Sequence, residues 1–248
     1  MAKEKHKLEP LLFKDFQLEQ LIFEFRFIFG KNYLESLRLF WSEIQNELSG
    51  EFRLIEQGET TILNYNSKFE IRLVADRFAV IELYPDSAIK EFLQLARVFY
   101  NAAVKFSEIE NLTRVGLRAV YAKDYDNPKL VAEALYQTKY INFPHDLYLI
   151  ENGIPLIPSY AIGWQDEEKG IAYRLKGKAE KLGIDLPLKL TAKGDFPNFV
   201  EKEYNQVILD IDIYIHKHIL PGQFFSDEWI KQAHTTAKEE GLKFFGEQ

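Results

Sequence analysis

The chain has 248 residues and a formal net charge of −7 at pH 7, and it contains no cysteine, which excludes disulfides and thiolate metal sites. An acidic total weighs against general nucleic-acid binding, which normally needs a basic surface. No run of residues is apolar and long enough for a transmembrane helix, and the charged start MAKEKHKLEP lacks the apolar core of a signal peptide. We therefore expect a cytoplasmic protein that does not contact a membrane.

The first half of the chain predicts a strand, a helix, four strands and a second helix. We expect residues 1–9 to form a flexible charged tail. In LIFEFRFIF, residues 21–29, phenylalanine recurs at every second position, which predicts a strand with one apolar face. Residues 32–48 place apolar side chains three or four positions apart, as in an amphipathic helix. Four short strand patterns separated by turn signals predict an antiparallel meander over residues 52–84, and residues 88–106 predict the second helix.

The second half predicts the same order of elements. RVGLRAVYA, residues 114–122, reads as a strand, and PKLVAEALYQT begins a short helix with proline at its first position. Strand patterns follow in residues 157–164, 170–177, 186–192 and 205–220, and we expect the basic stretch KGKAEKLG after the second of them to be a solvated loop. A closing helix is predicted over residues 226–245, with Ser226 or Asp227 as its N-cap.

A strand, a helix, four strands and a helix therefore occur twice, in residues 10–108 and 109–248. This order is similar to that of the TATA-binding-protein-like fold, in which two copies share one curved sheet. We predict an α+β protein made of two tandem β-α-β4-α units that form one curved antiparallel sheet, with the helices on one face and the other face open.

Charged side chains occupy the strand positions opposite the apolar ones, so they should gather on the open face. They include Glu24, Glu70, Arg174 and Lys176. The residues that we expect to bind a partner are Arg26, Arg72, Arg114, Arg118, Asp210, Asp212, His216 and His218. Opposite charges on neighbouring strands also pair without any function, for roughly 0.2–1 kcal/mol each.

The stretch LDIDIYIHKHIL, residues 209–220, offers a metal site as an alternative. His216 and His218 would lie on one face of a strand with roughly 6.6–7 Å between their Cβ atoms, close enough to share a metal with Asp212. Asp210 and Asp212 could instead hold Mg²⁺ or divide acid and base roles, joined by Glu82 if the two halves bring it near. The sequence has no HExxH motif and no glycine-rich phosphate loop. We therefore predict no catalytic residue, no metal and no cofactor, and favour a protein that is not an enzyme.

A saddle lined by these arginines could instead contact the phosphates of a duplex or an RNA–DNA hybrid. The carboxylates expected among the arginines would repel phosphate, whereas mixed charge suits a folded protein partner. We therefore expect a protein partner, a second copy of the chain, or both. A nucleic-acid-binding saddle is the second hypothesis, and a metal-dependent enzyme that uses Asp210, Asp212, His216 and His218 is the third.

Three segments together resemble a sporadically distributed bacterial family of proteins of about this length without an assigned activity. They are LEPLLFKDFQLEQLIFEFRF near the start, TRVGLRAVYAKDY in the middle and VILDIDIYI near the end. The chain keeps the family's R-x-G-L-R strand as Arg114, Gly116, Leu117 and Arg118, but it has AVY next, where the resemblance leads us to expect an aromatic residue and an asparagine. The scattered distribution of that family implies an accessory system, such as phage defence or a toxin–antitoxin locus, with a partner encoded by a neighbouring gene.

Overall fold

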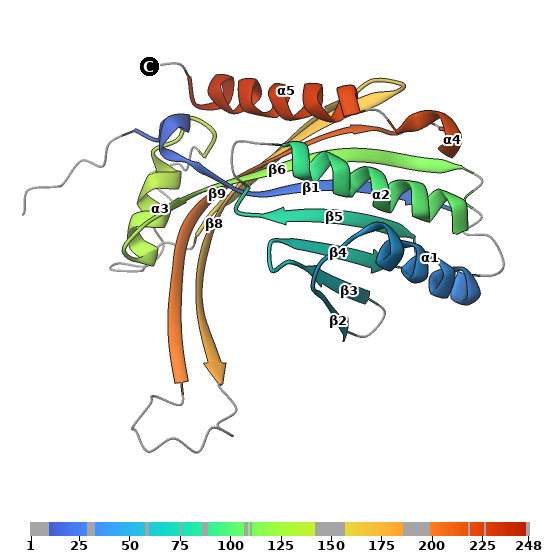
Figure 1. Cartoon of the computed structure of the whole chain (residues 1–248). Helices are drawn as coiled ribbons and strands as arrows, with labels where there is room; N and C mark the ends of the chain where they lie inside the picture. The colour runs from blue at the N-terminus through green and yellow to red at the C-terminus, as the bar shows by residue number, and fades with distance from the viewer. Residues whose placement is uncertain are drawn as a thin grey trace, which may run out of the picture.

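The computed structural model describes residues 10–28, 33–57, 60–74, 76–85, 89–106, 109, 111–141, 157–185, 199–217, 219–225 and 227–246. The predicted α+β class with one large antiparallel sheet is confirmed. Within these residues, nine strands form a single sheet in the order β2-β3-β4-β5-β1-β6-β9-β8-β7 (Figure 1). The strands are β1 Gln17–Phe27, β2 Phe52–Gln57, β3 Thr60–Tyr65, β4 Phe69–Val74, β5 Arg77–Leu83, β6 Leu112–Asp124, β7 Ser159–Gln165, β8 Lys169–Asp185 and β9 Phe199–Ile215. The helices are η1 Phe13–Asp15, α1 Tyr33–Glu47, α2 Lys90–Phe106, α3 Pro128–Tyr136, α4 Pro221–Phe224 and α5 Asp227–Phe245.

The first half has the predicted order β1-α1-β2-β3-β4-β5-α2. In the second half the described order is β6-α3-β7-β8-β9-α4-α5, with three strands after α3. The fourth predicted strand, residues 186–192, and the predicted tail, residues 1–9, lie outside the described residues. The two halves meet at the centre of the sheet, where β1 pairs with β6 and Phe23 stands opposite Leu117.

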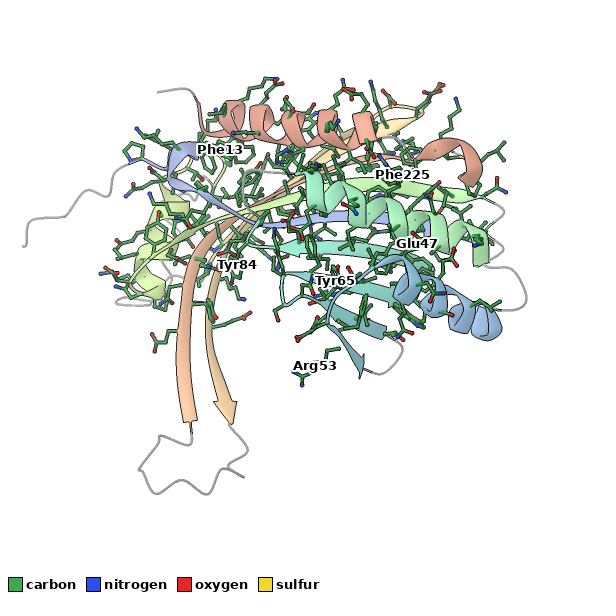
Figure 2. The ribbon with its side chains drawn as sticks, in the orientation of Figure 1. Phe13, Glu47, Arg53, Tyr65, Tyr84 and Phe225 are labelled. Carbon is green, nitrogen blue, oxygen red and sulfur yellow. The ribbon has the colours of Figure 1, made fainter. Side chains whose placement is uncertain are left out.

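The core lies between the sheet and the helices α1, α2 and α5, which share one face of the sheet (Figure 1). Phenylalanine at alternate positions of β1 faces this layer, because successive strand residues point to opposite faces. The ring of Phe78 lies 5.4 Å from Phe25, 5.3 Å from Phe27 and 5.0 Å from Phe40 of α1. Figure 2 shows Phe13 and Phe225 near opposite ends of the layer beneath α5.

Strand β8 is longer than its pattern indicated. The stretch KGKAEKLG, expected to be a solvated loop, continues β8 to Asp185. Gly177 does not end the strand; a Cβ there would overlap Ile157, Val131 and Leu135, so glycine serves the close approach of α3. Residues 179–185 of β8 and 199–205 of β9 pair only with each other among the named strands. They form a two-stranded arm that projects away from the helices (Figure 1).

Candidate binding surface on the open face of the sheet

The open face is the side of the sheet opposite α1, α2 and α5. The strand register places Ile22, Arg118, Asp212 and Ala172 side by side across β1, β6, β9 and β8. Two residues farther along the strands, and on the same face, Glu24 and Tyr214 stand on either side of Gly116. The predicted charged positions of the central strands therefore do share one surface.

Seven charged side chains form an arginine–carboxylate cluster on this face: Glu24, Arg26, Arg114, Arg118, Arg174, Asp210 and Asp212. Arg118 donates from Nε to Asp210 Oδ1 at 2.6 Å and from Nη2 to the other carboxylate oxygen. Arg174 Nη1 lies 3.3 Å from Asp210 Oδ2, and its Nη2 lies 3.7 Å from Asp212 Oδ2. Asp210 is therefore held by two guanidinium groups.

Arg114 connects the aspartates to β1. Its Nη2 donates to Asp212 Oδ2 at 2.8 Å and its Nη1 to Glu24 Oε1 at 3.1 Å. Glu24 also accepts a hydrogen bond from Arg26 Nε at 2.8 Å. The cluster therefore spans four adjacent strands, β1, β6, β9 and β8, and joins the two halves of the chain.

The cluster is layered, with its aspartates beneath its arginines. The side chains of Asp210 and Asp212 are only 1% and 8% exposed, whereas those of Arg118 and Arg174 are 40% and 42% exposed. Burying a carboxylate is costly unless it is paired and hydrogen-bonded, which these arginines achieve. The short acids lie next to the sheet and the long arginines fold over them, so the surface presents guanidinium groups.

The charge of Arg118 is stabilised by its acidic neighbours. Burial alone would lower the pKa of its guanidinium. The hydrogen bond to Asp210 and the negative charges of Asp210, Asp212 and Glu24 outweigh that effect, so the pKa lies above its ordinary value. The acidic neighbours of Arg118 therefore favour its charged form.

An aromatic ring supports Arg114. The guanidinium carbon of Arg114 lies 4.3 Å from the centre of the Tyr214 ring, a cation–π contact. The Tyr214 ring occupies the space above Gly170, where a Cβ would overlap its outer atoms. This role of Gly170 was not predicted from the sequence; a strand glycine next to a cross-strand aromatic residue was the available signal.

Other predicted residues lie outside the cluster. Arg72 pairs with Glu70 on β4, and Ala79 of β5 separates it from Glu24 in the register. The His216 ring nitrogen Nε2 lies 2.9 Å from the carbonyl oxygen of Asp166 in the β7–β8 turn. His218 lies outside the described residues.

The aspartates of the metal and acid–base alternatives are paired with arginines. Over the described residues, no three histidine or acidic side chains are grouped so that they could hold a metal ion. Glu82 stands opposite Leu21 on the helix-covered face and lies 3.0 Å from Lys68 Nζ, so it is not a neighbour of Asp210. The aspartates are already engaged by arginines, and what the surface offers is the outward N–H groups of those arginines.

No model of a known protein family matches the chain, and no curated protein sequence matches it either. Within the described residues, no helix is long and apolar enough to cross a membrane. The open face itself is therefore the basis for a functional proposal.

Proposed function

We propose that this protein is a non-enzymatic binding protein whose open sheet face binds an acidic surface of a partner protein. The observation that supports this most directly is the layering of the cluster, with buried Asp210 beneath the half-exposed Arg118 and Arg174. The buried acids fix the arginines in place before any partner arrives. Binding then costs less side-chain entropy than it would for free arginines.

The chemistry of guanidinium suits a carboxylate partner. Each guanidinium has five N–H donors in a planar fork, and Arg118 uses two of its nitrogens for Asp210. The remaining N–H groups can bind carboxylate oxygens of a partner, with the geometric selectivity that charge-assisted pairs provide. Arg26 and Arg72, with side chains 38% and 49% exposed, extend the basic surface toward β4.

The surroundings of the open face suit an extended partner. The β8–β9 arm projects from the sheet on the side away from the helices (Figure 1). We further propose that the two halves are variants of one β-α-β4-α unit, as in the TATA-binding-protein-like fold. The central β1–β6 pairing supports this relationship.

We propose, from the family resemblance seen in the sequence, that the protein belongs to a bacterial accessory system. In that setting we propose that the partner is encoded by a neighbouring gene, or is a second copy of the chain. The open face serves either partner through the same arginines.

A nucleic-acid-binding saddle is the second candidate. The acids expected to repel phosphate are largely buried beneath arginines, which weakens the objection raised by the sequence. The cluster holds four arginines and three carboxylates, however, so its excess of positive charge is one. So small an excess favours a protein partner over a polyanion.

The test is a pull-down from the native host with the tagged full-length chain, followed by identification of bound protein and nucleic acid. We expect the wild-type chain to capture an acidic protein. The Arg174→Glu variant should capture at least about tenfold less of it. Lys231→Glu is the matched control, because Lys231 lies on α5, on the other face, and is about as exposed as Arg174. Retention of the protein by the Arg174→Glu variant would show that the open face is the wrong surface. Nuclease-sensitive capture of nucleic acid would select the second candidate instead.

A further inference from the structure

A long groove lies on the helix-covered face, between α5 and the outer strands β7, β8 and β9. Its volume is about 1020 Å³. One wall is a stripe of α5 with three- or four-residue spacing: Trp229, Gln232, Thr236, Glu240 and Lys243. From Trp229 to Lys243 this stripe measures roughly 21 Å at 1.5 Å per residue. The groove is therefore elongated and runs alongside a helix.

The floor of the groove is apolar but incompletely covered. Ile162, Ile171 and Ile213 of the three strands are only partly buried. Trp164 of the edge strand β7 is 57% exposed, although its ring packs edge-on against Tyr173. A contiguous exposed apolar surface of this kind usually marks an interaction site.

The opposite wing of the sheet shows what normally covers such a surface. There Leu63, Ile71 and Leu73 of β3 and β4 are buried, and α1 lies beside α2 with its Phe40 against β5. In the second half, α3 packs farther along β8 and β9, close to Gly177, so it does not occupy the equivalent place beside α5 (Figure 1).

We infer that this groove binds an amphipathic α-helix of a partner protein, which lies beside α5 as α1 lies beside α2. A helix contributes apolar side chains at positions i, i+3, i+4 and i+7, which matches a long groove with an apolar floor and polar walls. The backbone hydrogen bonds of a helix are internal, so none is required from the groove.

The charge at one end of the groove orients that helix. At the β7–β8 turn, Asp166, Glu167 and Glu168 face two lysines, Lys169 and Lys217, which leaves one net negative charge. The other end is marked by Tyr140, whose ring centre lies 5.4 Å from Tyr160 and 4.0 Å from Phe244.

At that second end, Lys139 and Lys243 are balanced by Glu239 and Glu240. Glu240 accepts from Lys243 Nζ at 2.6 Å and from Tyr173 Oη at 2.5 Å. A helix dipole is positive at its N-terminus and negative at its C-terminus. The bound helix therefore has its N-terminus at the β7–β8 turn, where the net charge is negative.

The test uses a displayed library of helix-forming peptides with apolar residues at i, i+3, i+4 and i+7, selected on the full-length protein. Thr236→Arg fills the groove, whereas Thr235→Arg is the matched control, because the neighbouring threonine is exposed and does not line the groove. Two of the three tryptophans, Trp164 and Trp229, line the groove, so their fluorescence reports binding there.

We expect enriched peptides to change this fluorescence and to bind with micromolar affinity. Thr236→Arg should lower that affinity at least about tenfold, and Thr235→Arg should leave it unchanged. Peptides whose affinity falls only for the Arg174→Glu variant bind the open face. If all enriched peptides are of this kind, the groove proposal is wrong while the proposed function stands. Failure to enrich any helix, or a groove that takes oligosaccharides or lipids but no helix, also overturns it.

Discussion

Arg118 of β6 and Asp210 of β9 form a two-pronged ion pair although they do not stand opposite each other. The register pairs Arg118 with Asp212 and Val120 with Asp210, so the guanidinium reaches diagonally to the deeper acid. Arg174 approaches the same carboxylate from β8. Arg114 then takes Asp212. Each buried aspartate is therefore paired with an arginine of β6, and the ion pairs connect β6, β9 and β8.

Asp210→Asn should destabilise the protein by about 2 kcal/mol, in the range for hydrogen bonds to charged groups. The amide leaves Arg118 and Arg174 close together without the charge that holds them. Urea unfolding measures the change. As a control, Asp76→Asn breaks an exposed pair with Arg77 and should cost less than about 1 kcal/mol. Equal effects of the two changes would mean that the cluster adds nothing beyond ordinary surface pairs.

The elements with strong local patterns could be predicted from the sequence. The alternation in β1 and β9 and the helical spacing in α2 are strong within each segment, so no tertiary information is needed to recognise these elements. The bounds of β9 were wrong, because it runs from Phe199 to Ile215 and not over residues 205–220. The same alternation correctly placed Arg118 and Asp212 on one face. The polar face of LDIDIYIHKHIL could be identified in this way.

How deeply the side chains of this polar face are buried could not be predicted from the sequence. Which of two opposite charges lies underneath depends on side-chain length and on diagonal contacts between strands, as for Asp210 beneath Arg118. The groove beside α5 was also missed, because α3 takes its position by packing near Gly177, which no local pattern of residues 128–138 reveals. Both features arise from contacts between segments distant in sequence.

Phe78→Ala should lower the free energy of unfolding by about 3–5 kcal/mol, the usual cost of removing a buried ring. Phe78 is almost fully buried and touches rings from β1 and α1, so truncation leaves a cavity between the sheet and the helices. Denaturant unfolding tests this. The matched change Phe52→Ala removes a partly buried ring from edge strand β2 and should cost clearly less. A cost for Phe78→Ala below that of Phe52→Ala would place the core elsewhere.

Gly241→Ala should destabilise the protein by about 1–3 kcal/mol, although alanine is the better helix former. Gly241 lies inside α5, where a Cβ would overlap the ring of Phe13 in η1. The double variant with Phe13→Leu should recover part of the loss, which a double-mutant cycle in urea would measure. Thr235→Ala, at an exposed position of the same helix, should be neutral or stabilising. A stabilising Gly241→Ala would show that α5 does not pack closely on η1.

His234 should give the protein a pH-dependent stability. Burial in α5, and then the charge of Lys238 one turn later, hold the pKa of its imidazole below the ordinary 6.5. The unfolded chain therefore binds more protons than the folded one between these two pKa values. Stability from this residue is intact above pH 6.5 and is lost as the pH falls through the folded pKa.

An NMR titration of the His234 ring should show this low pKa directly, and Lys238→Gln should move it upward by removing a like charge. His234→Gln should reduce the loss of urea stability between pH 7 and mildly acidic pH, because glutamine does not titrate. Lys129→Gln, at an exposed position of α3, serves as the control with the same charge change on another helix. A ring pKa at or above 6.5 in the wild type would contradict the burial argument. So would an unchanged pH dependence in His234→Gln.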